Sequence, residues 1–149
     1  MEGSYKKLAI TIAINSVVMF LLTYVMIDSM DHFLLNINKV YMTLMMVAPM
    51  VVLMLIVMGS MYKNKQLNLA LIVIFVALFA GVFWLARTQT PVGNEQFLRS
   101  MIPHHSSAIL MCEESAINDP EILSMCEEIV ATQQEEIAQM EDILARLNH

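Results

Sequence analysis

Three long apolar runs without a charged side chain dominate the chain, and they span residues 8–27, 40–60 and 67–86. Each is about 20 residues long, the length at which a helix rising ~1.5 Å per residue crosses ~30 Å of hydrocarbon. The first run is longer than the apolar core of a signal peptide, and no small-x-small cleavage pattern follows it. The sequence therefore predicts an integral membrane protein with three transmembrane helices held in a lipid bilayer.

Charged residues near the apolar runs indicate an orientation. Lys6 and Lys7 precede the first run, and Lys63 and Lys65 follow the second. Because positively charged segments stay on the cytoplasmic side, we expect both segments to be cytoplasmic. Three crossings of the cell (inner or plasma) membrane then place everything after Arg87 in the periplasm or outside the cell.

The polar remainder of the chain is strongly acidic. Residues 1–90 hold six basic and three acidic side chains, a net charge of +3, whereas residues 91–149 hold two basic and eleven acidic ones, a net charge of −9. Phosphate binding requires clustered Lys and Arg, so nucleic acid is not expected as a partner. We expect a transmembrane region over 1–87, a linker over 88–93 and a helical domain over 94–149.

The acidic domain has the pattern of a helical hairpin, which makes the expected fold class all-α. Asn94 can cap a first helix over about 94–117, and Asp119 with Pro120 can begin a second helix over about 120–147. An antiparallel pair that turns at residue 119 brings together positions whose numbers sum to roughly 238, to within about one turn. Cys112 then faces Cys126, and the two histidines at 104 and 105 fall opposite Gln133 and Gln134.

In the second helix, apolar residues recur about every 3.5 residues and form a row along one face. Two consecutive positions of this row, Gln133 and Glu136, are polar. Burying an amide and a carboxylate is costly unless they are hydrogen-bonded or bind something. Imidazole and thioether groups near them favour copper, and in particular Cu(I), since thioethers are soft ligands. The expected metal ligands are His104, His105, Met101, Met111 and Met140, with Gln133 and Glu136 in support. The alternative is that the histidines are solvated and the methionines fill a core.

These residues resemble a known family. The pattern M-I-P-H-H-x-x-A-I-x-M occurs at Met101–Met111, and Q-x-x-E-I-x-x-M occurs at Gln133–Met140. Both are similar to the hallmark of the DUF305 family, and the three-span region resembles a membrane-anchored subgroup of it. The resemblance implies a ferritin-like helical bundle and, as in characterised periplasmic members, copper binding. The chain has one hairpin where longer members have four helices, which implies a homo-oligomer in which two hairpins pair.

Two further sets of residues offer a secondary route for a metal ion. In the second apolar run, methionines recur at intervals of four and so form a slowly drifting stripe on one helix face. They can pass a soft cation along the helix or serve as flexible packing residues, with Pro49 kinking the span. The segment between the first two runs adds a carboxylate–histidine–methionine cluster, which is either a relay or a solvated loop. The residues of this possible relay are Met30, His32, Met42, Met46, Met50, Met54 and Met58.

The two cysteines, Cys112 and Cys126, can form a disulfide that closes a loop of about 15 residues and adds roughly 3 kcal/mol. Two buried thiols or two Cu(I) thiolates are the alternatives.

The sequence predicts a membrane-anchored metal-binding protein that sequesters or relays copper at the outer face of the membrane. One alternative is a structural, oligomerising anchor that recruits a partner protein. Another is a ferritin-like metal oxidase, which is disfavoured because the chain lacks the Glu-x-x-His pairs of di-iron bundles.

Overall fold

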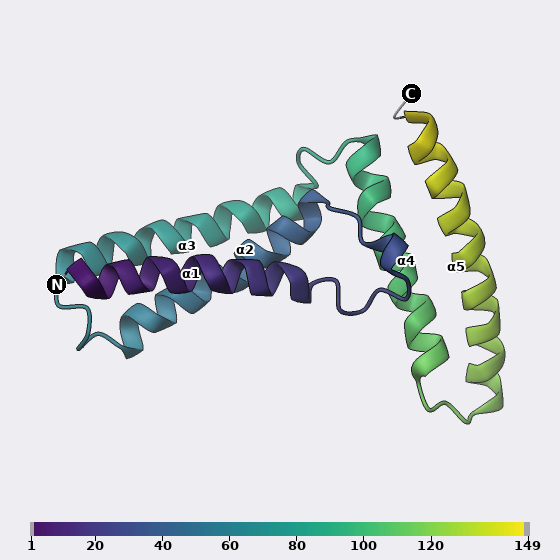
Figure 1. Ribbon diagram of the computed structural model, residues 1–149, viewed down its shortest axis with the longest axis horizontal. Helices are drawn as coiled ribbons and strands as arrows, with labels where there is room; N and C mark the ends of the chain where they lie inside the picture. Colours follow the sequence, from purple (N-terminus) through teal and green to yellow (C-terminus); the bar gives the residue numbers. More distant parts are fainter. Residues whose placement is uncertain (1, 148–149) are drawn as a thin grey trace. The chain divides into compact units, whose positions relative to one another are not determined.

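The computed structural model describes residues 2–147, and no strand occurs among them. Five α-helices follow one another, with a short 3-10 helix, η1, between the first two (Figure 1). Their bounds are α1 (Glu2–Leu22), η1 (Met30–His32), α2 (Ile37–Val57), α3 (Lys65–Thr88), α4 (Asn94–Glu114) and α5 (Pro120–Leu147). The expected all-helical class is confirmed, and α1, α2 and α3 are each long and apolar enough to cross a membrane.

The helix boundaries differ from the apolar runs at several ends. α1 ends at Leu22, five residues before the end of the first run, because Tyr24 leaves the helix and its hydroxyl donates to the Leu34 carbonyl at 2.7 Å. α3 begins two residues early, at Lys65, because the Asn64 side chain caps it by accepting the Leu67 N–H at 3.0 Å.

The chain divides into two compact units that are not contiguous in sequence. The first, the three-helix unit, contains the residues up to Thr23 together with Asn38–Pro91. The second, the two-helix unit, contains Tyr24–Ile37 together with the residues from Val92 onward. The segment between α1 and α2 therefore packs with α4 and α5.

The three-helix unit has a narrow apolar core built around α2. Leu8 of α1 packs with three residues of α2, which are Val47, Val51 and Leu55. Tyr62, in the connection between α2 and α3, belongs to the same cluster. The opposite faces of the helices carry exposed Ile, Val, Leu and Phe side chains, such as Ile14 and Phe83. Apolar residues on both the inside and the outside of a helix are typical of a membrane-spanning helix.

Polar groups at the end of this unit nearest the N-terminus satisfy one another. The Tyr5 hydroxyl lies 2.7 Å from the Asn68 side-chain oxygen, and the Asn68 amide donates to the Tyr62 carbonyl at 2.7 Å. Because Tyr5 is in the first turns of α1 and Asn68 is in the first turn of α3, these two helices run in the same direction. α2 must then run antiparallel to both of them.

In the two-helix unit, α4 and α5 lie side by side and run in opposite directions (Figure 1). Asp119 caps α5, since its Oδ1 atom accepts the N–H groups of Glu121 at 3.0 Å and Ile122 at 3.2 Å. Pro120 occupies the first position of α5, where a missing N–H has no cost. The core between the two helices consists of Leu98, Ile102, Ile109, Ile137 and Leu144.

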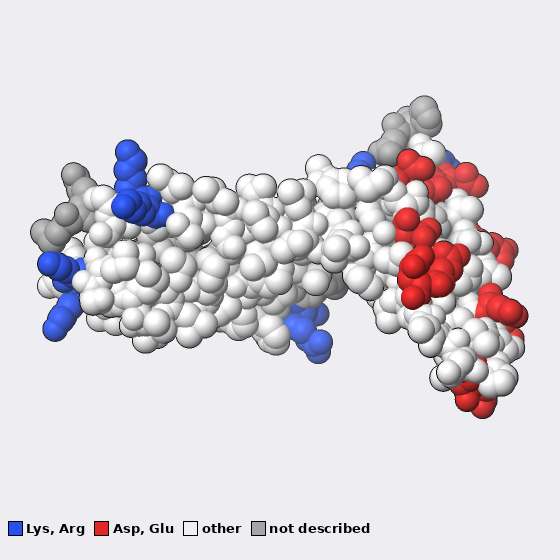
Figure 2. All heavy atoms as spheres, turned by 60° about the horizontal axis from the view of Figure 1, so that its bottom comes forward, with Lys and Arg blue, Asp and Glu red and all other residues white. Residues whose placement is uncertain are grey.

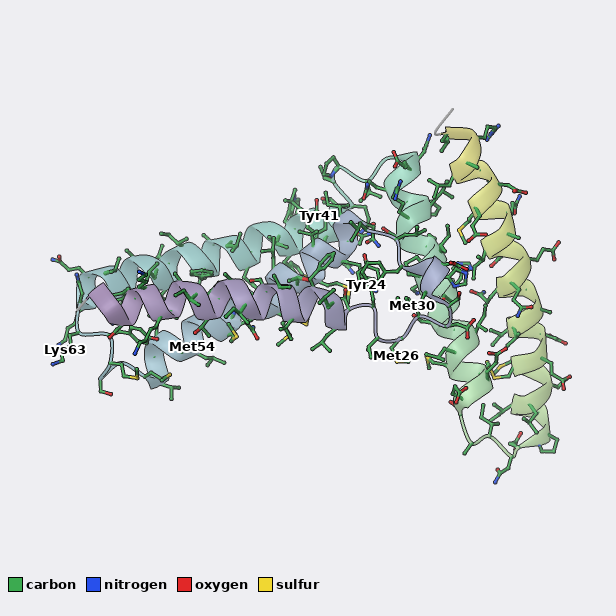
Figure 3. All side chains as sticks on the ribbon, viewed as in Figure 1. Tyr24, Met26, Met30, Tyr41, Met54 and Lys63 are labelled. Atoms are coloured by element: carbon green, nitrogen blue, oxygen red, sulfur yellow. A yellow bond between two sulfur atoms is a disulfide. The ribbon has the colours of Figure 1, made fainter. Side chains whose placement is uncertain are left out.

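The segment between α1 and α2 forms a third layer on α4. Leu34 packs against the core of the two-helix unit, and the buried Asn36 donates through Nδ2 to the Arg99 carbonyl at 3.1 Å. The Ile37 N–H donates to the side-chain oxygen of Gln96 at 2.9 Å. Figure 3 labels Tyr24, Met26 and Met30 along this segment. Burial raises the pKa of the Tyr24 phenol, and a hydrogen bond with the Asn36 backbone acts in the opposite direction.

Candidate functional site

Helix α4 presents three different faces, and each face holds one part of the candidate site. The first face packs on α5 and carries Leu98, Ile102 and Ile109. The second carries the fully buried Pro103 and Ser106 and meets the segment between α1 and α2. The third carries Phe97, Met101, His104, Ala108 and Met111 at a spacing of three and four, and Phe97, His104 and Met111 are exposed.

His105 lies on the face toward α5 and meets an acid there. Its Nδ1 atom lies 3.0 Å from Oε2 of Glu136, and the His105 side chain is only 13% exposed. The Nδ1 atom is shielded from solvent, although the carboxylate lacks the alignment of a regular hydrogen bond. Gln133, one turn before Glu136, donates its amide to the same Oε2 atom at 3.4 Å. The structure thus brings together His105, Glu136 and Gln133 of the expected site.

His104 and Met101 lie on the third face of α4. His104 is exposed and Met101 is half-buried. The His104 and His105 rings are neighbours, with centroids 5.9 Å apart. Met101 precedes the two histidines by three and four residues, the spacings at which side chains on a helix meet. Met101, His104 and His105 therefore offer one thioether and two imidazoles within a single turn of α4.

The other two thioethers expected at this site lie in different surroundings. Met140 packs against the apolar core between α4 and α5, beside residues such as Leu144. Met111 is 58% exposed and follows His104 by seven residues, a rise of about 10 Å along the helix. Met101 is thus the thioether nearest to both imidazoles along α4.

Ser106 is a functional-site candidate that the sequence reasoning missed. Its Oγ atom accepts the Asp28 N–H at 2.7 Å and lies 2.8 Å from Nδ1 of His32. Ser106 is completely buried, so this hydroxyl anchors the segment between α1 and α2 on the side of α4 adjacent to His105.

The expected relay residues occupy several environments. In the segment between α1 and α2, Met30 is 78% exposed, whereas His32 is held by Ser106. In α2, the Met50 sulfur accepts the Asn15 amide at 2.9 Å, and Met54 packs against the core of the three-helix unit. Met42 and Met46 of α2 are exposed, as is Met58, which follows the last residue of the helix.

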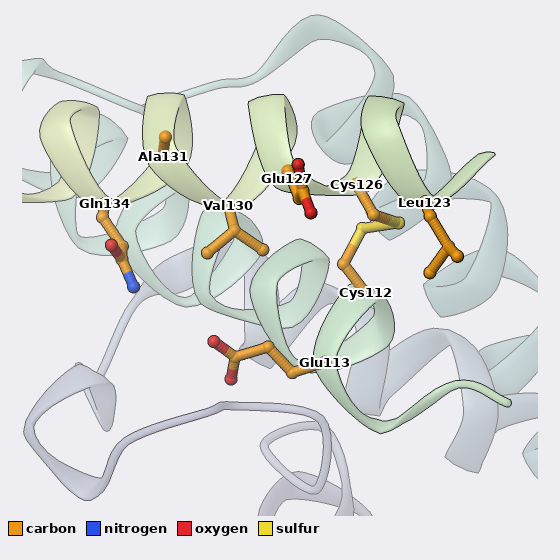
Figure 4. Close-up of a pocket in the computed structure, with 8 residues that line it drawn as sticks. All are labelled: Cys112, Glu113, Leu123, Cys126, Glu127, Val130, Ala131 and Gln134. Atoms are coloured by element: carbon orange, nitrogen blue, oxygen red, sulfur yellow. A yellow bond between two sulfur atoms is a disulfide. The ribbon is translucent and has the colours of Figure 1, made fainter. Parts of the chain in front are cut away.

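Cys112 and Cys126 form a disulfide between α4 and α5, with their Cα atoms 5.3 Å apart. A cavity of about 370 Å³ lies against it (Figure 4). Leu123 and Val130 form apolar walls, and the side chains of Glu113 and Glu127 line the same cavity.

Charge is distributed unevenly over the two-helix unit. On the face drawn in Figure 2, carboxylates gather over this unit, which accords with the eleven acids after residue 90. Within residues 2–147, however, no three His, Cys, Asp or Glu side chains converge on a metal-sized site.

The candidate residues of α4 and α5 fall within a stretch of the chain that matches a family model. Residues 82–144 match the DUF305 family model. The description of that family is "Domain of unknown function (DUF305)". The matched residues include both histidines of α4, the Gln133–Glu136 pair and both cysteines, which supports the resemblance found in the sequence. The segment between α1 and α2 lies outside this stretch.

The chain is also similar to an uncharacterized protein of Acanthamoeba polyphaga mimivirus. The two are 35% identical over 97 residues. The alignment covers 64% of this chain and 62% of the viral protein, so the chain spans less than two thirds of that relative. No solved structure gives a significant match.

Proposed function

We propose that this protein is a membrane-anchored copper-binding protein in which α4 of the DUF305 region carries the metal site. Met101, His104 and His105 bind Cu(I), and the protein sequesters the ion or relays it at the outer face of a cell membrane. The three apolar helices anchor the site, with the N-terminus and the Lys63–Lys65 turn in the cytoplasm.

The contact between His105 and Glu136 is the observation that carries this proposal. A histidine that binds a metal commonly directs its other ring nitrogen at a carboxylate, which fixes the tautomer and the orientation of the ring. Here Nδ1 of His105 faces Glu136 at 3.0 Å, so the Nε2 lone pair is left to bind a metal. Gln133 holds the carboxylate in turn.

The donor set favours Cu(I) over harder ions. Met101 adds a thioether one turn from both imidazoles, and soft thioether ligands select Cu(I) among the biological metals. Carboxylate-rich clusters, which suit Mg²⁺, Ca²⁺ and di-iron centres, do not form among residues 2–147. The oxidase alternative is therefore supported less well than copper binding.

A second copy of the chain completes this site in our proposal. On the face of α4 that bears Met101, His104 and Met111, the side chains of His104 and Met111 are exposed. Between Arg99 and Glu113 this helix carries no Asp, Glu, Lys or Arg, whereas α5 is lined with acids. Two copies that pair through α4 keep their acidic α5 helices apart and add a second set of imidazole and thioether donors.

A Cu(I) titration of the detergent-purified chain against a chromogenic chelator tests the proposal. We expect tight Cu(I) binding that is lost in His104→Ala/His105→Ala and kept in the surface control Glu114→Gln. Equal binding by all three proteins would overturn the assignment, and no binding by any of them would favour a structural anchor. Turnover of cuprous or ferrous ions with dioxygen would instead indicate an oxidase.

A further inference from the structure

The cysteines of the two-helix unit lie in matching surroundings. The tetrapeptide Met-Cys-Glu-Glu occurs at residues 111–114 in α4 and again at residues 125–128 in α5. The two tetrapeptides lie on antiparallel helices, and the disulfide joins their cysteines. Each cysteine therefore has the same residue types before and after it along its helix. Each cysteine therefore has an exposed thioether before it, Met111 or Met125, and a cavity-lining carboxylate after it.

We infer that Cys112 and Cys126 are a redox-gated metal-binding pair. When the disulfide is reduced, the two thiolates bind one soft monovalent ion, Cu(I) or Ag(I). This site is separate from the His105 site and does not depend on it.

The fold keeps the two cysteines adjacent after reduction. On one side, the buried Ile109 and the partly buried Val130, each about one turn from a cysteine, pack in the core between the helices. On the other side, residues 115–119 connect the helices within a few residues of Cys112. The Cα atoms are 5.3 Å apart, a separation from which both sulfur atoms reach one ion.

An ion and a reductant can both approach this pair. Cys112 is half-buried, and the cavity of about 370 Å³ is bounded by both cysteines. Figure 4 shows a carboxylate from each helix beside the disulfide, those of Glu113 and Glu127. Neither belongs to the ion pairs of the described residues, which are Arg99–Glu95 and His105–Glu136. Both carboxylates therefore raise the local concentration of cations.

The donor chemistry favours a two-coordinate ion. Thiolates are soft ligands and carboxylates are hard ones, so we expect Glu113 and Glu127 to stay outside the ligand set of a soft ion. The carboxylates attract a cation without completing the four ligands of a closed zinc site. Two thiolates alone suit Cu(I) and Ag(I).

The chemistry balances when a dithiol supplies the electrons. One thiolate of the dithiol attacks a sulfur of the disulfide and forms a mixed disulfide, which the second thiol of the reductant then displaces. Two electrons and two protons pass to Cys112 and Cys126, and the dithiol becomes a disulfide. Binding of one monovalent ion by the pair then releases the two thiol protons.

The test compares oxidised and reduced full-length protein in detergent, with dithiothreitol removed under argon and Ag⁺ as the probe. We expect the reduced protein to bind one more Ag⁺ per chain than the oxidised protein, and that single ion to protect both thiols from a thiol reagent. Cys112→Ser/Cys126→Ser should lose the extra ion. Met111→Leu/Met125→Leu, which removes only the flanking thioethers, should keep it.

Three results would overturn the inference: no additional Ag⁺ on reduction, one Ag⁺ for each thiol, or an extra ion that persists in the serine variant. Zn²⁺ binding as tight as Ag⁺ binding would also contradict a two-coordinate site. Repeating the titration in His104→Ala/His105→Ala separates the two sites, because the extra ion should survive in that variant even though its Cu(I) site is removed.

Discussion

The Nδ1 atom of His105 in α4 lies 3.0 Å from the Oε2 atom of Glu136 in α5. This contact crosses the interface between two helices that are otherwise joined by Leu, Ile and a disulfide. The Glu136 side chain is 46% exposed, so its pairing with His105 contributes at most about 1 kcal/mol to stability. In the proposed copper site, this contact orients the ring of His105.

Replacing Glu136 should weaken Cu(I) binding without abolishing it. In Glu136→Gln the ring loses its charged partner, and changes of this kind typically reduce metal affinity by about 10–100-fold. Competition with a chromogenic Cu(I) chelator measures the effect. The matched control is Glu135→Gln, because Glu135 is the exposed neighbour of Glu136 on α5. An equal loss in both variants would show that general negative charge, and not orientation of His105, supports binding.

The thioether of Met101 should affect Cu(I) selectively. Met101→Leu keeps the size of the side chain but removes a soft donor, so we expect Cu(I) affinity to fall roughly tenfold, or about 1.4 kcal/mol. Affinity for Zn²⁺, measured in parallel, should change little because zinc does not require thioethers. The control is Met140→Leu, in which a core methionine changes at constant volume. Unchanged Cu(I) binding in Met101→Leu would remove this thioether from the site.

The register of the α4–α5 pair shows how far sequence reasoning reaches. A turn at residue 119 and antiparallel helices suffice to place Cys112 opposite Cys126, which the disulfide joins. Farther from the turn, the same rule places His105 opposite Gln133, whereas its partner is Glu136, one helical turn away. A small difference in the angle between the two helices shifts the pairing more at greater distance from the turn. No residue pattern in the sequence specifies that angle.

The docking of the segment between α1 and α2 could not be predicted in the same way. Asp28 and Ser106 are 78 residues apart, and their hydrogen bond joins a backbone N–H to a side-chain hydroxyl. A hydrogen bond of this kind produces no periodic pattern in the amino-acid sequence. A serine within a helix can also have many other roles. The apolar runs, by contrast, follow directly from the cost of placing charges in hydrocarbon.

The disulfide should stabilise the two-helix unit. It closes a loop with a sequence separation of 14, for which chain entropy predicts about 3 kcal/mol. We expect Cys112→Ser/Cys126→Ser to unfold at lower denaturant concentration and to lose hydrogen-exchange protection in α4 and α5. Protection in α1 and α3, which belong to the other unit, should stay the same. Equal protection of α4 and α5 in both proteins would show that the apolar core alone determines their stability.

Ser106 should matter for stability far more than the adjacent Ser107. In Ser106→Ala the Asp28 N–H and the His32 ring lose their shared partner inside the protein, and an unsatisfied buried donor costs about 1–3 kcal/mol. Ser107 only donates back to the Pro103 carbonyl at 2.8 Å, so Ser107→Ala should change the unfolding free energy by less than about 0.5 kcal/mol. Amide hydrogen exchange over residues 28–32 gives a local readout, because release of the segment should speed exchange there before the helices open. Exchange at wild-type rates in Ser106→Ala would mean that Leu34 and Asn36 hold the segment without the hydroxyl.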